Sequence, residues 1–301
     1  MNILILGNSS DEHARHLKQA LTEADVKVNY LDTRRFPTQL RISWQPKTQI
    51  GSLQLSDGYQ LEFQDIKSVY WRSFTGVEVP NLEESYQQMV AFNDSMSALR
   101  TMLQACDARW VNSWQAYQFH KEKPLQLSQV KQSWVKIPDT LITNNPEQVI
   151  SFAQLHEKVI FKPVYGGAHT QILTDSHLEP ERLNLALSIS PITIQEYIPG
   201  TNIRSYVIAD SVYSAEIRSN SLDFREDFQA QLIPIDLPTR VKQDCFTIAK
   251  ALHLEWTAID WRRTPGGEYF FLEANPSPMF IHFEQQTGFP ITDKLVNLLM
   301  A

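Results

Sequence analysis

Three oxygen-bearing side chains near the end of the chain have the spacing of a metal site. Asp260 and Glu273 lie in strand-like runs on either side of Gly266-Gly267, a pair suited to a two-residue hairpin loop with positive φ angles. Folding about that pair places Asp260 directly opposite Glu273, and strand alternation puts Asn275 on the same face. Facing carboxylates have Cβ atoms about 5 Å apart and repel each other, so a bound cation is the simplest stabilising partner. Oxygen ligands of this kind suit Mg²⁺, which often shares them with a nucleotide phosphate.

The same hairpin has a second interpretation. Arg262 falls on the acidic face, where it could neutralise the two carboxylates as an ordinary salt bridge. The opposite face is mostly apolar and would anchor the hairpin in a core through Trp261, Phe270, Leu272 and Ala274. Taken alone, the hairpin leaves the metal site and the salt bridge equally open.

A lysine followed by a glycine-containing loop suggests contact with phosphate. Lys162 closes the apolar strand 159–162, and the next loop contains Gly166 and Gly167. Backbone amides of such a loop can approach a phosphate while the lysine supplies a point charge. The loop lacks the GxxxxGK[ST] order and joins two predicted strands, so it is not a P-loop. The alternative is an ordinary lysine at a strand end.

Three arginines follow within one compact region. Arg204 starts a predicted hairpin whose other arm ends at Arg218, and Arg225 comes shortly afterwards. Near a metal site they could clamp an anionic substrate or a developing phosphoryl charge. The alternative is surface ion pairing with the acidic residues of the same region, Glu216, Asp223, Glu226 and Asp227.

The N-terminal elements indicate a doubly wound α/β domain. Residues 2–6 and 26–31 predict two strands separated by a helix. The loop after the first strand has one glycine where a dinucleotide fingerprint needs three, so it predicts only a strand-to-helix turn. A strand over 66–72 and a long amphipathic helix follow. Its apolar stripe predicts a surface that faces the core: Met89, Phe92, Met96, Leu99, Leu103 and Cys106.

We expect this domain to end near residue 118. Beyond it, the pattern predicts strands over 140–142, 159–162, 193–198, 203–209 and 212–217. Helices are predicted over 146–156, 239–253 and 291–300. Pro199-Gly200 ends the third of these strands and could form a hinge.

Composition excludes several classes of protein. The chain has 301 residues, 43% of them hydrophobic and 20% charged, which indicates a folded globular protein. The formal net charge of −7 and the absence of a basic block argue against a nucleic-acid binder. No apolar run approaches transmembrane length, and the N-terminus does not look like a signal peptide, so no membrane partner is expected. Cys106 and Cys245 lack a metal-ligand spacing and fit a reducing cytoplasm.

The order of these pieces resembles the ATP-grasp superfamily. A Lys-Pro strand before a Gly-Gly loop is followed by Gln-Glu-Tyr-Ile-Pro, Asn-Ile-Arg, Asp-Trp-Arg and Leu-Glu-Ala-Asn-Pro. The closest similarity is to the RimK-type branch, which includes the graspetide (microviridin-type) peptide macrocyclases. The resemblance extends over nearly the whole chain, counting Asp32-Thr33-Arg34-Arg35-Phe36-Pro37 and Val69-Tyr70-Trp71-Arg72.

This resemblance implies an α/β protein of the α+β ATP-grasp class. An N-terminal doubly wound α/β domain over 1–118 would precede two α+β lobes, 119–197 and 198–301, whose antiparallel sheets clasp ATP. Lys123 and Lys162 would contact the nucleotide phosphates, Lys162 beneath the loop of Gly166 and Gly167. The Mg²⁺ ligands would be Asp260, Glu273 and Asn275, with Mn²⁺ able to substitute.

The resemblance assigns roles to the remaining candidates as well. Arg204, Arg218 and Arg225 would face the substrate carboxylate or the transferred phosphate. Glu196 and backbone groups would recognise the adenine base. The residues that line this adenine pocket would be Gln195, Glu196, Tyr197 and Ile198.

The activity implied is that of an ATP-dependent carboxylate ligase with an acyl-phosphate intermediate. Its substrate would be a precursor peptide in which side-chain esters or amides form. One alternative is a RimK-type carboxylate–amine ligase that adds an amino acid to a small molecule or a protein tail. An alternative of another class is a non-catalytic, nucleotide-gated peptide-binding protein. The resemblance also makes a homodimer an expectation.

Overall fold

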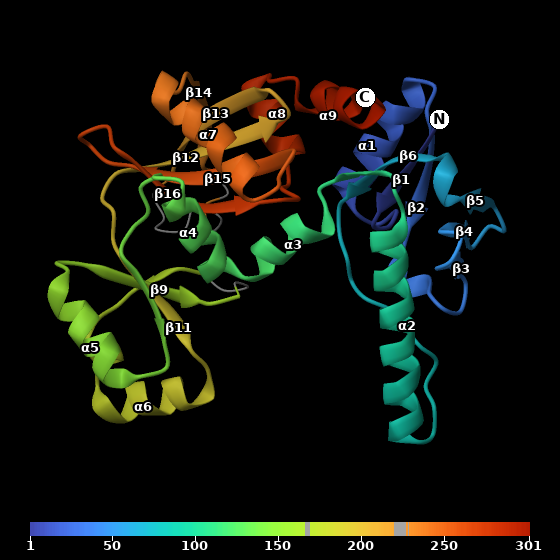
Figure 1. The fold of residues 1–301 in the computed structure, drawn as a ribbon. Helices are drawn as coiled ribbons and strands as arrows, with labels where there is room; N and C mark the ends of the chain where they lie inside the picture. Colours follow the sequence, from blue (N-terminus) through green and yellow to red (C-terminus); the bar gives the residue numbers. More distant parts are fainter. Residues whose placement is uncertain (166–168, 220–226, 228) are drawn as a thin grey trace. The chain divides into compact units, whose positions relative to one another are not determined.

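The computed structural model describes residues 1–165, 169–219, 227 and 229–301, and the chain forms two compact units (Figure 1). Unit 1 consists of Met1–Gln115, Leu254–Trp256 and Ser277–Ala301, and unit 2 of Ala116–His253 and Thr257–Pro276. The C-terminal segment belongs to unit 1 because helix α9 (Ile291–Met300) packs on its sheet, where the Ser68 hydroxyl donates to the Leu299 carbonyl oxygen at 2.7 Å. The division into three domains at residues 118 and 197 stays a prediction.

Unit 1 is built on a parallel sheet, as the β-loop-α-β start predicts. Strands β1 (Asn2–Leu6), β2 (Lys27–Leu31), β6 (Ile66–Trp71) and β7 (Arg109–Val111) pair in the order β2-β1-β6-β7. Most of β1 is buried, the pattern of a central parallel strand. Helix α1 (Glu12–Glu23) contributes Ala14, Leu17 and Leu21 to the core, and α8 (Ile281–Thr287) also belongs to unit 1.

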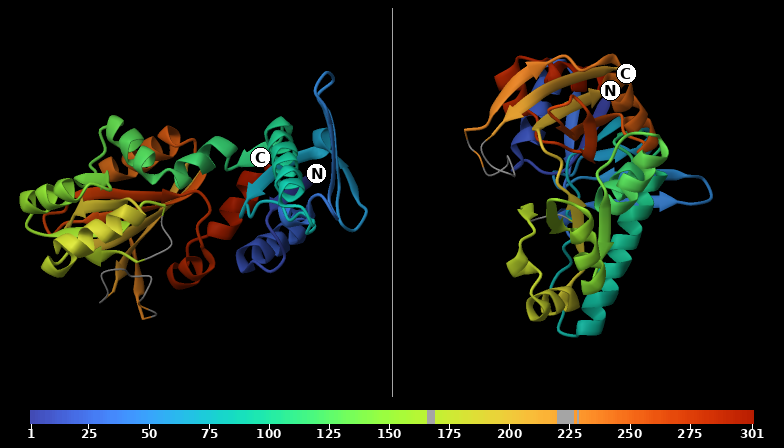
Figure 2. Two further views of the ribbon diagram at one scale, coloured as in Figure 1. Left: turned by 90° about the horizontal axis from the view of Figure 1, so that it is seen from below. Right: turned by 90° about the vertical axis from the view of Figure 1, so that its left-hand side faces the viewer.

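The sequence interpretation missed a second, smaller sheet in unit 1. Strands β3 (Arg41–Gln45), β4 (Ile50–Gln54) and β5 (Gln60–Glu62) form an antiparallel sheet. Figure 2 shows it projecting from the rest of unit 1. Its strands are short and their side chains alternate between exposed and less exposed positions, so no continuous apolar run marks them.

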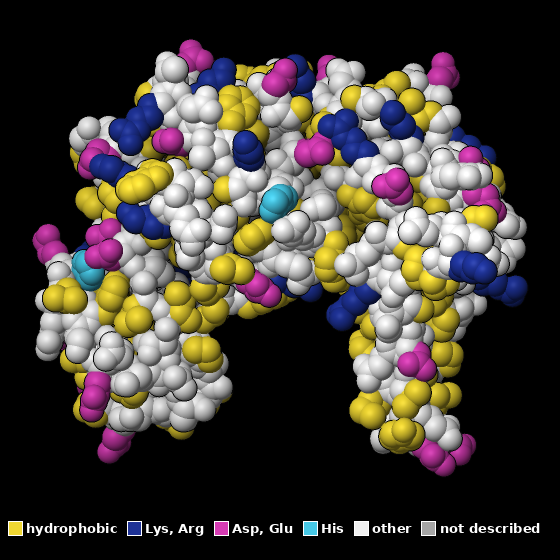
Figure 3. Space-filling model, in the orientation of Figure 1, with side chains coloured by type: hydrophobic (Ala, Val, Ile, Leu, Met, Phe, Trp, Pro, Cys, Tyr) yellow, Lys and Arg dark blue, Asp and Glu magenta, His cyan; other side chains and the backbone are white. Residues whose placement is uncertain are grey.

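Helix α2 (Ser85–Ala105) only partly follows its predicted burial. Met96, Leu99 and Leu103 are buried, but Met89 is 52% and Phe92 44% exposed. The prediction of one continuous core face was therefore wrong for the first two turns. A helix of 21 residues spans about 32 Å, whereas strands of five or six residues span only about 17–20 Å, so α2 extends past its sheet. Hydrophobic side chains gather along this projecting part in Figure 3.

The first sheet of unit 2 is antiparallel and carries helices on one face. Strands β8 (Thr140–Thr143), β9 (Val159–Pro163), β10 (Gln171–Ile172) and β11 (Ile192–Glu196) pair in the order β10-β9-β11-β8. Helices α5 (Pro146–Leu155) and α6 (Pro180–Ile189) cover that face. The buried core between them is Val149, Val159, Leu183, Leu187 and Ile194. Helices α3 (Trp114–Lys121) and α4 (Lys123–Gln132) precede this sheet in the chain.

The second sheet of unit 2 has five strands in the order β14-β13-β12-β15-β16. They are β12 (Thr201–Ile208), β13 (Ser211–Arg218), β14 (Gln231–Ile235), β15 (Trp256–Arg263) and β16 (Tyr269–Asn275). Helix α7 (Thr239–Ala251) buries Cys245 and Ile248. Within the part of the chain that the structure describes, no helix is long and apolar enough to cross a membrane.

The β15–β16 hairpin pairs Asp260 with Glu273, which confirms the prediction, although the route differs. The loop has three residues rather than two, 265–267, because the Thr264 N–H donates to the Glu268 carbonyl oxygen at 2.9 Å, and Gly267 has the positive φ, +83°. This loop shifts the pairing near the turn by one residue. A bulge between Asp260 and Trp261 shifts it back. The prediction of a two-residue Gly-Gly loop was wrong, and the two deviations cancel at the acidic pair.

Gly200, in the link between β11 and β12, does not tolerate a side chain. Its φ is +135°, and a Cβ atom there would lie 1.9 Å from the Arg263 carbonyl oxygen. We expect Gly200→Ala to lower the free energy of unfolding by about 2–4 kcal/mol, because backbone must move to admit the methyl group. Urea unfolding followed by circular dichroism measures this loss.

Gly267→Ala is the matched control for this prediction. Gly267 also has a positive φ, but a Cβ atom there meets nothing within 4 Å. The substitution should therefore cost only about 1 kcal/mol of backbone strain. Equal losses for the two variants would show that the close approach to Arg263 is unimportant.

Candidate active site

The acidic pair of β15 and β16 is balanced by cations from two other elements of unit 2. Arg204 on β12 donates two hydrogen bonds to Asp260, from Nε to Oδ1 at 2.7 Å and from Nη2 to Oδ2 at 2.8 Å. Lys123, at the start of α4, donates to Glu273 Oε2 at 2.5 Å. The salt-bridge interpretation therefore selected the wrong arginine, since Arg204 rather than Arg262 pairs with Asp260.

The surroundings of Glu273 keep its carboxylate ionised. Burial by itself raises the pKa of the Glu273 carboxyl, but Lys123 beside it, together with Lys162 and Arg204, lowers that pKa well below its usual range. Asn275 lies two residues further along β16 on the same face as Glu273. Two carboxylates and an amide oxygen on adjacent strand positions are hard ligands that Mg²⁺ accepts. These residues therefore fit a magnesium ion.

Lys162 lies near the same carboxylate, from the other sheet of unit 2. It is close enough to Glu273 to lower the pKa of that carboxyl. Its Nζ makes a long hydrogen bond of 3.5 Å to Gln195 Oε1, and Gln195 Nε2 donates to the Thr140 hydroxyl at 2.8 Å. The structure thus brings Lys123, Lys162 and Gln195 towards one region, where two ammonium groups can meet the phosphates of a nucleotide.

The Glu196 side chain is not part of this group. Ile194 packs in the core under α5 and α6, and alternation directs Glu196 to that same face, away from Lys162 and Gln195. The Glu196 carboxylate accepts a hydrogen bond from the Asp139 backbone N–H at 2.9 Å. Only the backbone of Glu196 therefore remains a candidate for contact with the base.

Glu196 also lies in a small cluster with Asp139 and His156. His156 places Nε2 3.7 Å from Asp139 and Nδ1 3.8 Å from Glu196. A different ring nitrogen faces each carboxylate, whereas one nitrogen would have to serve as ligand in a shared metal site. We interpret the cluster as a polar contact between the end of α5 and β11.

Arg262 organises the link between the two sheets of unit 2. Its guanidinium donates to the Ile198 carbonyl oxygen at 2.8 Å, to Asn202 Oδ1 at 3.0 Å and to the Tyr197 hydroxyl at 3.2 Å. The Tyr197 ring also receives the Lys158 ammonium at 4.3 Å from its centroid. A pocket of about 760 Å³ opens beside these side chains. The predicted adenine-lining backbone is therefore held by an arginine that sequence reasoning placed with the carboxylates.

Arg218 does not join Arg204. Arg204 on β12 lies directly opposite Ala215 on β13, so alternation places Arg218 on the other face of the sheet. There it is largely exposed, and its Nε donates to Glu216 at 3.2 Å. Ordinary ion pairing, the alternative considered for this region, describes Arg218. Gly166, Gly167 and Arg225 lie outside the described residues.

Sequence reasoning missed two residues that support the site. Thr140 accepts the hydrogen bond from Gln195, and Gln126 on α4 contacts the backbone of Ala274 between Glu273 and Asn275. Gln126 follows Lys123 by three residues, so the two share one face of a helix. That spacing was a usable signal, whereas nothing local marks Thr140.

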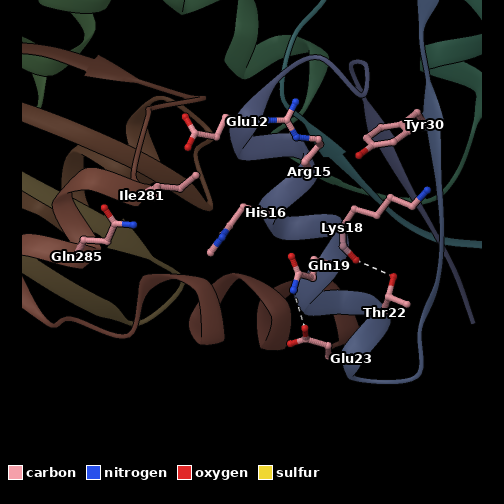
Figure 4. Close-up of a pocket in the computed structure, with 10 residues that line it drawn as sticks. All are labelled: Glu12, Arg15, His16, Lys18, Gln19, Thr22, Glu23, Tyr30, Ile281 and Gln285. Carbon is pink, nitrogen blue, oxygen red and sulfur yellow. Dashed lines mark hydrogen bonds between the residues drawn. The ribbon is translucent and has the colours of Figure 1, made fainter.

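The open groove shown in Figure 4 lies in unit 1 along α1 and has a volume of about 750 Å³. Charges of both signs line it, and several of them contact their neighbours. Gln19 donates to Glu23 at 2.9 Å, and the Lys18 ammonium lies 4.7 Å from the centroid of the Tyr30 ring. This arrangement is typical of a solvated helix face, and we assign no chemistry to it.

A lysine-bearing antiparallel sheet, joined by a Pro-Gly link to a sheet that carries paired carboxylates, defines an enzyme of the ATP-grasp class. The model of the RimK-like ATP-grasp domain matches residues 120–299, more than half of the chain, and that of the MvdD pre-ATP grasp domain matches residues 2–118. The chain belongs to the RimK-like ATP-grasp family. It is an ADP-forming ATP-grasp ligase, and the expected fold class is confirmed.

Solved structures give the same result. The ATP-grasp ligase PsnB in complex with a minimal precursor is 28% identical with a TM-score of 0.85, covering 99% of this chain and 97% of that one. Macrocyclase MdnC bound with precursor peptide MdnA from Microcystis aeruginosa is 27% identical with a TM-score of 0.86, covering all of both chains. D-alanyl-alanine synthetase A from Vibrio cholerae, at 14% identity and a TM-score of 0.64, shares the fold. A comparison with curated proteins found no match.

Proposed function

We propose that this protein joins side-chain carboxylates of a precursor peptide to hydroxyl or amino groups of the same peptide, using ATP and Mg²⁺. Two observations on similar proteins support a peptide substrate: PsnB and MdnC were both solved with precursor peptides, and each matches this chain from end to end. A further PsnB structure contains the precursor with Mg and ADP. ATP and Mg²⁺ are accordingly the cofactors.

The observation that carries the proposal is the charge arrangement around Glu273. An ionised carboxylate directly opposite Asp260, with Lys123 at 2.5 Å and Lys162 nearby, provides ligands for a cation and positive charge for phosphates in one place. When bound, the magnesium ion supplies Lewis-acid neutralisation of phosphate charge. Asp260, Glu273 and Asn275 would hold it.

The protein's own residues would bind the nucleotide, orient the reacting groups and exclude water. Lys123 and Lys162 would hold the phosphates, and the backbone from Glu196 to Ile198, fixed by Arg262, would hold the base. A substrate carboxylate attacks the γ-phosphorus of ATP, which releases ADP and leaves an acyl phosphate. A hydroxyl or amino group then attacks the acyl carbon and releases phosphate, so the peptide loses one water for each bond formed. Alignment and charge neutralisation suffice for this chemistry, and no covalent protein nucleophile is needed.

Mass spectrometry separates this proposal from its alternatives. The protein is incubated with ATP, Mg²⁺ and short peptides encoded beside it, and peptide mass and ADP are both measured. Loss of one water per ADP released supports the proposal. A gain of one amino-acid unit would instead indicate a carboxylate–amine ligase of the ordinary RimK type. Nucleotide-dependent peptide binding without ADP release would indicate a non-catalytic binding protein.

We also propose a homodimer formed through the exposed half of α2. Met89 and Phe92 continue the apolar stripe whose later members are buried, so this exposed surface has the apolar character of a protein core. Residues 73–99 carry four acidic side chains and no lysine or arginine. An antiparallel pair of α2 helices centred on Ala91 would place Arg100 of each copy beside Glu83 and Glu84 of the other. Both the apolar stripe and the charges are therefore complementary to a second copy.

Sedimentation equilibrium tests the dimer. We expect the wild-type protein to sediment as a dimer at micromolar concentration and Phe92→Glu to sediment as a monomer, because the new charges would face each other across the two-fold axis. Gln87→Glu is the control, since Gln87 is exposed on the opposite side of α2 and should leave the dimer intact. A monomeric wild-type protein would rule the dimer out.

The buried free thiols Cys106 and Cys245 support the cytoplasmic location, which is also a proposal.

A further inference from the structure

Gln126 is a buried polar side chain whose hydrogen-bonding groups are directed at the backbone of the metal-site strand. It lies on α4 and is 2% exposed. Its Nε2 donates to the Ala274 carbonyl oxygen at 2.9 Å, and its Oε1 accepts from the Ala274 N–H at 2.9 Å. β16 is an edge strand of the five-stranded sheet, so these two groups of Ala274 face away from β15. One carboxamide thus takes the place of a neighbouring strand.

The two hydrogen bonds act on the peptide groups that carry the proposed ligands. The Ala274 N–H belongs to the peptide group that joins it to Glu273, and the Ala274 carbonyl belongs to the one that joins it to Asn275. Fixing both peptide planes fixes the directions in which the Glu273 and Asn275 side chains leave the strand. The bulge beside Asp260 makes this support important, because a bulged edge strand lacks a regular ladder at that point.

The same helix also positions the cation partner of Glu273. Lys123 precedes Gln126 by three residues on α4, and its ammonium contacts the Glu273 carboxylate at 2.5 Å. The two hydrogen bonds between Gln126 and Ala274 therefore hold α4 against β16 and set the position of Lys123 relative to Glu273. One face of α4 therefore holds both the backbone of the proposed metal ligands and the ammonium group that pairs with Glu273.

We propose that Gln126 is a positioning residue for the magnesium ligands Glu273 and Asn275. The inference rests on the proposed magnesium site and goes beyond it by assigning the residue that sets its geometry. A primary carboxamide is required because it presents one donor and one acceptor side by side, matching a backbone N–H and C=O. A carboxylate could accept but not donate, and an aliphatic side chain would leave both buried backbone groups without a partner.

Binding of Mn²⁺ in the presence of a non-hydrolysable ATP analogue tests this assignment without relying on turnover. Free Mn²⁺ is measured by electron paramagnetic resonance for the wild-type protein, Gln126→Met and Gln126→Asn. We expect the Mn²⁺ dissociation constant to rise about 10–100-fold in Gln126→Met, as for other residues that orient metal ligands, and less in Gln126→Asn. Gln132→Met, exposed on the same helix, should match the wild-type protein.

Circular dichroism and thermal unfolding decide between positioning and a purely structural role. Unchanged Mn²⁺ affinity in either folded Gln126 variant overturns the proposal, whatever happens to its melting temperature. Gln126→Asn keeps a polar group at the site and provides the comparison if Gln126→Met does not fold. Failure of the wild-type protein itself to bind Mn²⁺ with the analogue would instead overturn the magnesium site and the proposed function.

Discussion

Glu273→Gln is expected to lower ADP formation roughly 10²–10³-fold while leaving the protein folded, because the charge of a proposed metal ligand is lost without a change in size. Glu273 lies opposite Asp260, and its pKa is held low by Lys123, Lys162 and Arg204, so its negative charge is present throughout the neutral range. A carboxamide keeps an oxygen in place but cannot offset the charge of Lys123. The measurement is ADP release by a coupled assay, with circular dichroism and thermal unfolding on the same samples.

Glu268→Gln provides a matched control on the same hairpin. Glu268 lies in the exposed end of the hairpin, where its partner is Lys136, far along the strand from Asp260. Exposed ion pairs contribute about 0–1 kcal/mol, so this variant should keep both its stability and its activity. Normal ADP formation by folded Glu273→Gln would show that Glu273 is not a required metal ligand.

Arg204→Met is expected to destabilise the protein by about 3–5 kcal/mol and to abolish turnover, since it leaves Asp260 without its cation in a largely buried position. The side chains of Arg204 and Asp260 are 23% and 11% exposed, and the pair is bidentate at 2.7 and 2.8 Å. Removing one partner therefore leaves a carboxylate that can regain little hydration. Urea unfolding gives the stability change, and ADP release gives the activity.

The double variant Arg204→Met/Asp260→Leu separates the two effects. Replacing both members of a buried ion pair with apolar side chains removes the uncompensated charge, so most of the lost stability should return. Activity should not return, because a proposed magnesium ligand is gone. A double variant as unstable as Arg204→Met would show that packing rather than charge explains the destabilisation.

The acidic hairpin shows how far sequence reasoning reached and where it stopped. Two strand-like runs around a glycine pair were enough to place Asp260 opposite Glu273, because hairpin partners lie at nearly equal distances from their turn. The loop length and the bulge were not foreseen, because a glycine pair is compatible with more than one hairpin loop and no residue of the sequence marks the bulge. The pairing was nevertheless predicted correctly, because the one-residue shift caused by the loop is reversed by the bulge.

The arginines show the opposite outcome. Arg204 and Arg218 were grouped because they begin and end one predicted hairpin, but the face on which each lies depends on the register between β12 and β13. Arg204 lies opposite Ala215, and Ala209 in the intervening turn has a positive φ of 50°. A shift of one residue in the register set by that turn would have placed Arg218 on the same face of the sheet as Arg204. Composition does not indicate such a turn at an alanine.

The sequence by itself determined the chemical groups, their order and the alternation of each strand, and these sufficed to recognise a ligase with a paired-carboxylate site. Only the tertiary structure decided which cation serves which carboxylate. Lys123 reaches Glu273 across 150 residues and Arg204 reaches Asp260 across 56, while Arg262, two residues from Asp260, turns to the Tyr197–Ile198 link instead. The reason is physical: ion pairing and hydrogen bonding fall off over a few ångströms in space, and separation along the chain does not measure that distance.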